Sequence, residues 1–257
     1  RRARPTRERR RAHGPRTDRH TAPGSGAQPR PPAALDVAAV DAVIFYGLAA
    51  DDPVIKRAID RGRPVIGIDM SDQDGMISVG VDDADGAYQA ARHVLAKGHT
   101  KIAVLALPTS RQRIDRTATA ADFADATIRF PQDRWNGYAK ACVEAGIDPH
   151  SVKAIGNGFD AMKALLSLPK HLRPTAVLAM SDVLAHGAMQ ACAEDGVDIP
   201  ADLAIVGFDD APFAVEIGLS TVSQSPSDKA EIAVRCALGE DVDVTHLPAR
   251  LIDRQTA

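Results

Sequence analysis

Carboxylates directly follow two of the apolar stretches of this sequence. Asp209 and Asp210 come after Ala204–Phe208, and Asp69 comes after Pro64–Ile68. If both stretches are strands of a parallel sheet, these aspartates lie at its carboxyl edge, where ligands of α/β proteins bind. The spacing therefore predicts that Asp209 and Asp69 face a binding crevice.

Helix capping is the alternative role for the paired aspartates. Aspartate is a favoured N-cap residue, and a short helix is predicted around residues 212–217. Capping and ligand contact are equally supported for Asp210, whereas ligand contact is favoured for Asp209.

Catalytic motifs are absent from the sequence. We find no GxGxxG after a strand, no GxSxG, no HExxH and no P-loop, and histidines, cysteines and carboxylates do not cluster. Cys142, Cys192 and Cys236 lie far apart and form no CxxC pair. We therefore expect a binding protein that is not an enzyme and needs no metal or other cofactor.

The elements that must position these residues alternate along the chain from Val40 onwards. Strands are predicted at 43–46, 64–68, 77–81, 101–106, 175–180, 203–208, 221–224 and 249–252. Helices are predicted at 53–61, 83–97, 131–145, 160–167, 182–195 and 226–238, and residues 107–130 form a polar insertion without a clear period. This alternation predicts an α/β fold with doubly wound parallel sheets.

The first 34 residues differ from the rest of the chain. Residues 1–30 contain ten arginines and two acidic residues, although the whole chain has a net charge of −3. The segment is too poor in apolar residues to bury a core, so we expect residues 1–34 to be disordered. We favour a solvated tail, or sequence that is not native to this fold, over a nucleic-acid-binding arm, because the segment has neither helical periodicity nor aromatic residues for stacking.

No apolar run is long enough to span a bilayer, and the basic N-terminus lacks the apolar stretch of a secretion signal. We therefore expect no membrane partner, and the three unpaired cysteines make a reducing cytoplasm the expected compartment.

Several stretches occur in the order typical of one protein family. They are DAVIFYG (41–47), PVIGIDMSD (64–72), VDDADGAYQAARHVLAKGHTKIAVL (81–105), RWNGY (134–138), AVLAMSDVLAHGAMQACAEDGVDIPADLAIVGFDD (176–210), STVSQ (220–224) and PARLIDRQT (248–256). Together they resemble the sugar-binding-protein-like sensing domain of the LacI/GalR family of bacterial transcription regulators. The resemblance covers about residues 40–257.

The resemblance implies two α/β lobes hinged by three crossovers, with a small effector between them. It predicts an N-terminal lobe of residues 35–106 plus about 223–245, and a C-terminal lobe of 107–222 plus about 246–257. It also implies a homodimer.

The resemblance carries ligand roles to three charged residues. Arg134 matches an arginine that contacts the effector, and its planar fork of donors suits a carboxylate or vicinal hydroxyls. Asp209 matches a strand-end acid that accepts hydrogen bonds from effector hydroxyls, and Asp69 matches its counterpart in the other lobe. Turn capping is nearly as well supported for Asp69.

Three further positions are carried over in the same way. Phe159 occupies a place where the family often sets an aromatic against the sugar, and a plain core role is equally supported. Gln224 matches a crossover residue that lines the cleft or makes a hinge hydrogen bond. Ser181 matches a position with a small residue, and it could instead cap the following helix.

The sequence departs from the family pattern at its beginning. The family's helix-turn-helix DNA-binding head and the first strand, helix and second strand of the N-terminal lobe have no match here. The first lobe is therefore expected to be incomplete, and operator DNA to be bound only through a head that this chain lacks.

The preferred function is thus the effector-sensing domain of a LacI/GalR-type regulator, which binds a small sugar-like ligand between two lobes to control transcription. The ligand could be a sugar or a nucleoside. A solute-binding protein of a sugar transport system is the alternative, which the absence of a secretion signal and the match over 176–210 disfavour.

Overall fold

The computed structural model describes residue 35 and residues 39–111, 116–149, 153–156 and 158–257. The segment Ala39–Ala257 forms one compact unit, and the fold below is that of this unit. The predicted disordered segment, residues 1–34, lies outside the described residues. No helix in the described part of the chain combines the length and the apolar character needed to cross a membrane.

The first sheet is parallel and is built mainly from the N-terminal part of this unit. Its strand order is β1 (Val43–Tyr46), β2 (Val65–Ile68), β3 (Ile77–Val81) and β9 (His246–Leu247). Helix α9 (Pro226–Ala237) covers one face, where its Ala233 and Cys236 pack on Ile66, Ile68 and Val79. Helix α2 (Pro53–Asp60), which is capped by Asp52, connects β1 to β2. We call this sheet with α2 and α9 the first lobe.

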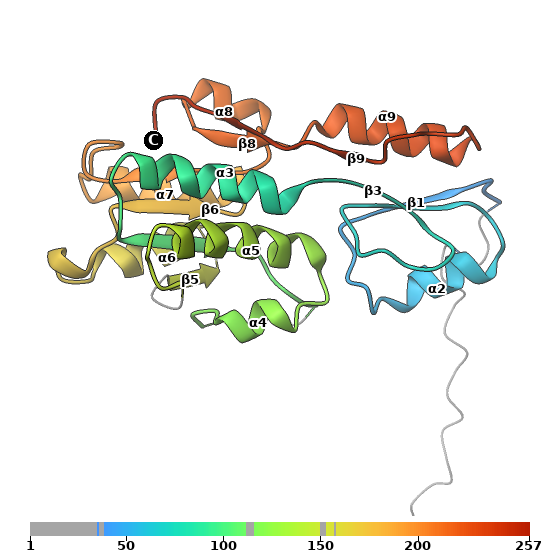
Figure 1. Ribbon diagram of the computed structural model, residues 1–257, viewed down its shortest axis with the longest axis horizontal. Coiled ribbons are helices and arrows are strands. Elements are labelled where there is room, and N and C mark those ends of the chain that lie inside the picture. The colour runs from blue at the N-terminus through green and yellow to red at the C-terminus, as the bar shows by residue number, and fades with distance from the viewer. Residues whose placement is uncertain (1–34, 36–38, 112–115, 150–152, 157) are drawn as a thin grey trace, which may run out of the picture. The chain divides into compact units, whose positions relative to one another are not determined.

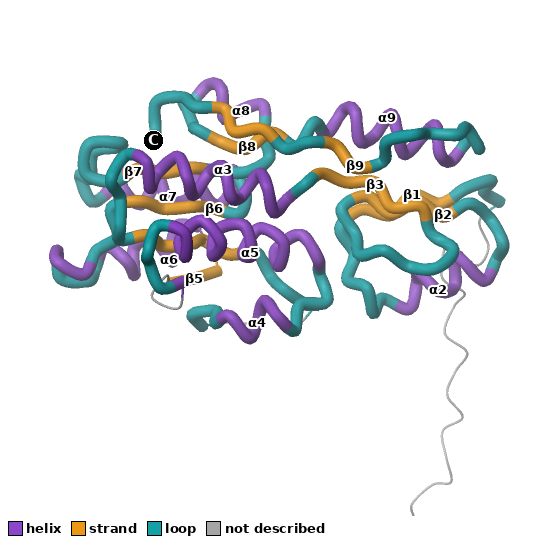
Figure 2. Tube along the Cα trace, in the orientation of Figure 1, coloured by secondary structure: helices purple, strands orange, loops and turns teal. Residues whose placement is uncertain are grey.

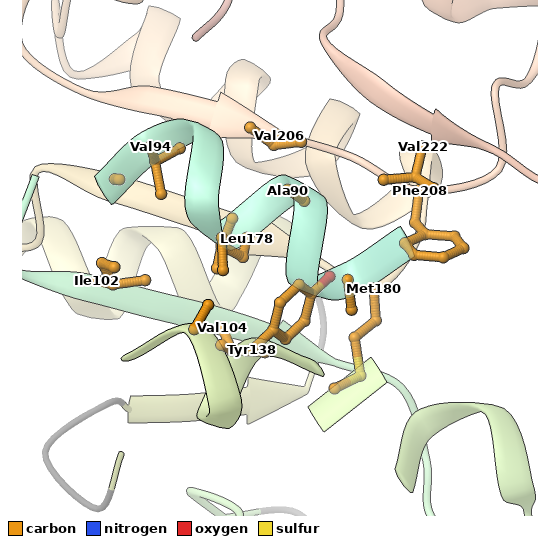
Figure 3. Packing of buried hydrophobic residues seen from close by; sticks show 14 of the residues in the cluster. Ala90, Val94, Ile102, Val104, Tyr138, Leu178, Met180, Val206, Phe208 and Val222 are labelled. Carbon is orange, nitrogen blue, oxygen red and sulfur yellow. The ribbon is translucent and has the colours of Figure 1, made fainter. Parts of the chain in front are cut away.

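The second sheet is also parallel, with the strand order β5 (Lys153–Gly156), β4 (Ile102–Ala106), β6 (Ala176–Ala179) and β7 (Ala204–Val206). Helices α3 (Asp83–Ala96) and α5 (Arg129–Glu144) pack on one face, and α6 (Gly158–Leu166) and α7 (Asp182–Glu194) pack on the other. Figure 3 shows Ala90 and Val94 of α3 above Ile102, Val104 and Leu178 of the sheet. We call this sheet with its four helices the second lobe.

The close contact between α3 and α5 depends on one glycine in the RWNGY stretch. A Cβ atom at Gly137 would collide with the backbone of α3, at the Ala84 carbonyl oxygen and the Tyr88 nitrogen. Because glycine lacks that atom, α5 can lie directly against α3 and set Arg134 beside the start of that helix.

Three crossings connect the two lobes in the described part of the chain. The chain passes from β3 into α3, from β8 (Thr221–Ser223) into α9, and from β9 into β10 (Arg250–Ile252) (Figure 1). β8 and β10 pair with each other as an antiparallel ribbon. Figure 2 shows the strands of the two sheets separately, with helices beside each. The predicted α/β fold with two parallel-sheet lobes is confirmed.

The lobe boundaries differ from those predicted. The strand Ile102–Ala106 pairs with β5 and β6 in the second sheet, so the first lobe ends before α3 and not at residue 106. Likewise β9 pairs with β3 in the first sheet, although residues 246–257 were assigned to the other lobe. Apolar periodicity predicts a strand but does not reveal which sheet it joins.

The predicted polar insertion contains a helix. Within residues 107–130, Ala120–Ala124 form α4, and Thr119 and Asp122 form a reciprocal capping box at its start. A helix of five residues is too short to show an amphipathic period, which is why the sequence pattern missed it. The strands β5 and β9 were also not predicted. The remaining elements are α8 (Pro212–Glu216) and the 3-10 turn η2 (Lys170–Leu172).

Candidate ligand-binding site

Backbone strain marks the ends of the two strands whose carboxylates were predicted to bind ligand. Asp69, after β2, has φ 53°, and Asp209 and Asp210, after β7, have φ values of 122° and 55°. Positive φ is uncommon for residues other than glycine and costs about 1–3 kcal/mol at each position. Such strain concentrates at functional sites, so the geometry points to these two strand ends.

A buried lysine connects the two strand ends. The Nζ atom of Lys229, in α9, donates to Asp69 Oδ2 at 2.5 Å and to Gln224 Oε1 at 2.8 Å. The Gln224 side-chain amide in turn donates to Asp209 Oδ1. Lys229 is only 2% exposed and Gln224 only 5%. Asp69, of the first lobe, is thus linked through hydrogen bonds to Asp209, of the second.

Arg134 extends this chain of contacts into the second lobe. Its Nε atom donates to Asp83 Oδ1 at 2.7 Å, and a terminal nitrogen donates to the Met180 carbonyl oxygen. The same terminal nitrogen lies 3.7 Å from Asp209 Oδ1, and the guanidinium stacks over the Phe208 ring at 3.7 Å. Salt bridge, hydrogen bond and cation–π contact therefore fix this 3% exposed side chain in one orientation.

We call the connected side chains the polar network. Its members are Asp69, Asp83, Arg134, Asp209, Gln224 and Lys229. It contains three carboxylates and two cations, and each cation lies within hydrogen-bond distance of one carboxylate. Asp209 has no ion pair this short, and its side chain is 35% exposed.

The electrostatics of the network single out Asp209. Burial raises the pKa of its carboxyl to about 6, although the nearby Arg134 guanidinium lowers it. Partial burial, followed by the carboxylates of Asp69 and Asp209, also raises the pKa of the Tyr46 hydroxyl to about 12. Tyr46 as a whole is 66% exposed, and its ring lies beside the network, with Lys229 Nζ 5.9 Å from the ring centre.

A pocket lies beside the network, between the strand ends of the first sheet and the start of α5. Its polar and small lining residues include Asp69, Gly80, Asp83, Arg129, Asp133 and His246. Asp69 Oδ1 is buried and has no hydrogen-bond partner among the described residues. No group of three or more His, Cys, Asp or Glu side chains in the described part of the chain is arranged to hold a metal ion.

Four of the six predicted site residues therefore come together: Asp69, Arg134, Asp209 and Gln224. Phe159 and Ser181 have other contacts. Phe159 packs against the core between α6, α7 and the second sheet. Ser181 caps α7 by accepting a hydrogen bond from the Leu184 amide at 3.2 Å. Ligand contact by these two residues stays a prediction.

Neither Asp209 nor Asp210 caps the short helix α8. The N-cap of α8 is Ala211, whose amide donates to Asp182 Oδ2 at 2.7 Å. Asp210 instead binds Arg254 at 2.7 Å. The capping alternative for the two aspartates is therefore wrong, and Asp182 of α7 supports the start of α8.

Sequence reasoning missed two members of the network, Lys229 and Asp83. A signal for Lys229 was present, because it shares one helical face with Ala233 and Cys236 at spacings of i, i+4 and i+7. A lysine on the buried face of an amphipathic helix requires a partner. Asp83 follows the capping residue Asp82 and carries no comparable signal.

Comparisons with known proteins agree with this fold. Residues 91–257 match the family described as "Periplasmic binding protein-like domain". The chain is 30% identical over 210 residues to the HTH-type transcriptional regulator Rv3575c of Mycobacterium tuberculosis, covering 78% of this chain and 58% of that protein. It is 32% identical over 157 residues to the ribose operon repressor of Escherichia coli, covering 58% of this chain and 42% of the repressor.

A solved structure of a LacI-family transcriptional regulator from Corynebacterium glutamicum superposes with a TM-score of 0.78 at 30% identity. The match covers 86% of this chain and 69% of that one. The chain thus belongs to the periplasmic binding protein-like domain family, in the form that LacI-family regulators carry. It spans about half the length of the curated relatives it matches.

Proposed function

We propose that this chain is the effector-sensing domain of a LacI/GalR-type transcription regulator and that it binds a small hydroxyl-rich ligand between its lobes. The observation that carries the proposal is the polar network, which joins the carboxyl ends of β2 and β7 through Lys229 and Gln224. Carboxylates and an arginine at opposed strand ends can accept from and donate to vicinal hydroxyls.

Each part of the network has a role in this proposal. Asp209 and Asp69 accept hydrogen bonds from ligand hydroxyls, and Arg134 donates to ligand oxygens. Gln224 stands on the crossover between β8 and α9, so a change in its hydrogen bonds is transmitted to the hinge. Because the two carboxylates belong to different lobes, a ligand that contacts both stabilises one relative arrangement of the lobes.

Regulation by the ligand follows from its stabilisation of one arrangement of the lobes. A ligand shifts a conformational equilibrium only by its differential affinity for the two states, typically about 1–3 kcal/mol for allosteric coupling. We propose that lobe closure changes the contacts with a second copy of the chain in a homodimer. This change alters binding to operator DNA in the cytoplasm. Two relatives that are named as an HTH-type regulator and an operon repressor support regulation over solute transport.

The nature of the ligand is proposed from the same observations. The network offers acceptors and donors in alternation, which suits a sugar, and one relative is named as a ribose operon repressor. A nucleoside offers the same vicinal hydroxyls. No step of this function requires catalysis or a cofactor.

Ligand-induced thermal stabilisation of the full chain tests the proposal. The probes are D-ribose, D-xylose, D-glucose, D-galactose, adenosine and guanosine, each at millimolar concentration. A ligand present at 100 times its Kd stabilises the folded state by about 2.7 kcal/mol, which gives a clear rise in Tm.

The expected result is a rise in Tm with at least one probe, which is reduced in Asp209→Asn and retained in Lys56→Gln. Lys56 lies on α2 with its side chain 79% exposed, so it is a surface control. A chain whose Tm responds to none of the probes, or responds equally in Asp209→Asn, contradicts the proposal.

A further inference from the structure

Lys229 is a cation placed among groups that the proposed function assigns to ligand binding. Two of the three N–H donors of its ammonium are engaged by Asp69 and Gln224. The side chain comes from α9, whose other buried members, Ala233 and Cys236, are apolar. A buried lysine without a carboxylate partner is strongly unfavourable, so Lys229 and Asp69 depend on each other.

Two of the three carboxylates of the network are closely paired with a cation. Lys229 lies against Asp69 at 2.5 Å, and Arg134 lies against Asp83 at 2.7 Å. At the pocket wall, Arg129 is paired with Asp133 at 3.0 Å. Asp209 is 3.7 Å from the nearest cation that contacts it, Arg134. At Asp69 and at the pocket wall a ligand therefore meets paired charges, whereas Asp209 is the network carboxylate without a short ion pair.

The free oxygen of Asp69 shows what this pairing achieves. Lys229 occupies Oδ2, whereas Oδ1 is buried without a hydrogen-bond partner among the described residues, and Asp69 is one of the residues that line the pocket. The carboxylate is thus turned so that one oxygen is neutralised and the other can accept one hydrogen bond. A neutral hydroxyl satisfies such an acceptor, whereas an ammonium group would meet the like charge of Lys229 close by.

We propose that Lys229 is a specificity-determining residue, which acts through Asp69 to make the site select uncharged polyols over amino sugars. The inference rests on the proposed function, because it concerns the choice among ligands of the same site. Lys229 is a positioning residue that orients Asp69. It also places a positive charge beside this carboxylate, where the amino group of an amino sugar would otherwise bind. Without it, Asp69 is an unpaired carboxylate that favours a cationic ligand.

The test measures charge selectivity and not affinity alone. Isothermal titration of the full chain uses three matched hexoses, the neutral D-glucose, the cationic D-glucosamine and the anionic D-glucuronate, together with D-ribose and 1-amino-1-deoxyribose. The variants are Lys229→Gln, which keeps a hydrogen-bonding side chain without the charge, and Lys229→Arg, which keeps the charge. Lys56→Gln is the matched control for loss of a lysine charge at the surface.

The expected result is that the wild-type chain binds a neutral sugar more tightly than its amino counterpart, and that Lys229→Gln shifts this Kd ratio toward the amino sugar by about tenfold or more. Lys229→Arg and Lys56→Gln keep the wild-type ratio. A purely structural role would weaken binding of neutral and amino sugars equally, which leaves the ratio unchanged and overturns the inference.

If Lys229→Gln does not fold, Asp69→Asn tests the same inference, and the expected shift in ligand charge preference is reversed. This variant leaves the Lys229 charge without its carboxylate, so the Kd ratio of glucose to glucuronate shifts toward the anion. An unchanged ratio overturns the inference while the proposed function stands. A wild-type chain that binds none of these five probes overturns the inference, whereas the proposed function fails only if the chain also binds none of the sugars and nucleosides used to test it.

Discussion

The two lobes present carboxylates at equivalent strand ends, but they are built to different degrees of burial. In the second lobe every residue of β4, β6 and β7 is buried, because helices cover both faces of the sheet. In the first lobe β1 alternates between half-buried and exposed positions, and Ile44 and Tyr46 are 42% and 66% exposed. The strands β4, β6 and β7 of the second lobe are therefore fully covered, whereas β1, at the edge of the first sheet, is partly exposed to solvent.

The two halves of the site are also held by different contacts. Asp209, Arg134 and Asp83 are all held by elements of the second lobe, with Arg134 locked by its salt bridge, hydrogen bond and ring contact. Asp69 belongs to the first lobe and is held by Lys229 and by its own backbone hydrogen bond to Val79. We expect the second lobe to form the fixed part of the site and the first lobe to be the part that responds to ligand.

The largest effect should come from the core of the second lobe. Leu178 of β6 is fully buried between the strands and α3, so Leu178→Ala removes packing and leaves a cavity. We expect a loss of about 3–4 kcal/mol in the free energy of unfolding, measured by urea denaturation. Ile44→Ala, on the exposed edge of β1, should cost less than about 1 kcal/mol. Equal costs would contradict the contrast between the two lobes.

The buried salt bridge of the second lobe should give the next largest effect. Arg134→Leu leaves Asp83, 6% exposed, without its cation, and breaking such a pair costs about 3 kcal/mol. The double variant Asp83→Leu with Arg134→Leu removes both charges and should recover much of that loss. Chemical denaturation of the three chains tests this, and a double variant less stable than the single one would show that the pair is not coupled in this way.

Asp209 should give the chain a specific dependence on pH. The folded state holds the Asp209 proton up to about pH 6, whereas an unperturbed aspartate releases it near 3.8. Between these values the folded state binds more protons, so the stability contributed by this group is fully present below about pH 4 and is lost as the pH rises to 6. Asp209→Asn escapes this loss, so its Tm relative to the wild-type chain should rise between pH 4 and pH 7. A relative Tm that stays level or falls is the opposing outcome.

The smallest effect should come from a surface ion pair of the first lobe. Lys56 and Asp60 lie one turn apart on α2 at 2.9 Å, with side chains 79% and 58% exposed. Lys56→Gln should change the free energy of unfolding by less than about 0.5 kcal/mol. A larger loss would mean that the first lobe depends on its surface pairs, which would reverse the contrast drawn above.

Strong periodic segments made most of the fold predictable. The buried strands and the helices with a regular apolar face, such as Asp83–Ala96 and Pro226–Ala237, lie where the pattern indicated. The two-residue strand β9 and the five-residue helix α4 are too short to carry a period. The assignment of Ile102–Ala106 to a sheet depends on tertiary pairing, which no local pattern contains.

The site was predictable where its residues follow strands. Asp69 and Asp209 could be found because an acid directly after an apolar strand lies at the carboxyl edge of a parallel sheet, where ligands bind, although capping was an alternative for both. Arg134 and Gln224 came only from the family resemblance, since neither has a distinctive local setting. Lys229 was overlooked because a lysine in a helix is ordinarily solvated, and only its register with Ala233 and Cys236 distinguishes it.

The most direct test of the account is isothermal titration of the full chain at pH 7.5 with whichever neutral sugar or nucleoside raises its Tm. The account predicts binding of one ligand per chain, weakened at least about tenfold both in Asp209→Asn and in Asp69→Asn, because the ligand contacts both lobes. Binding that is lost in only one of these variants, or in neither, would contradict a ligand site shared between the two strand ends.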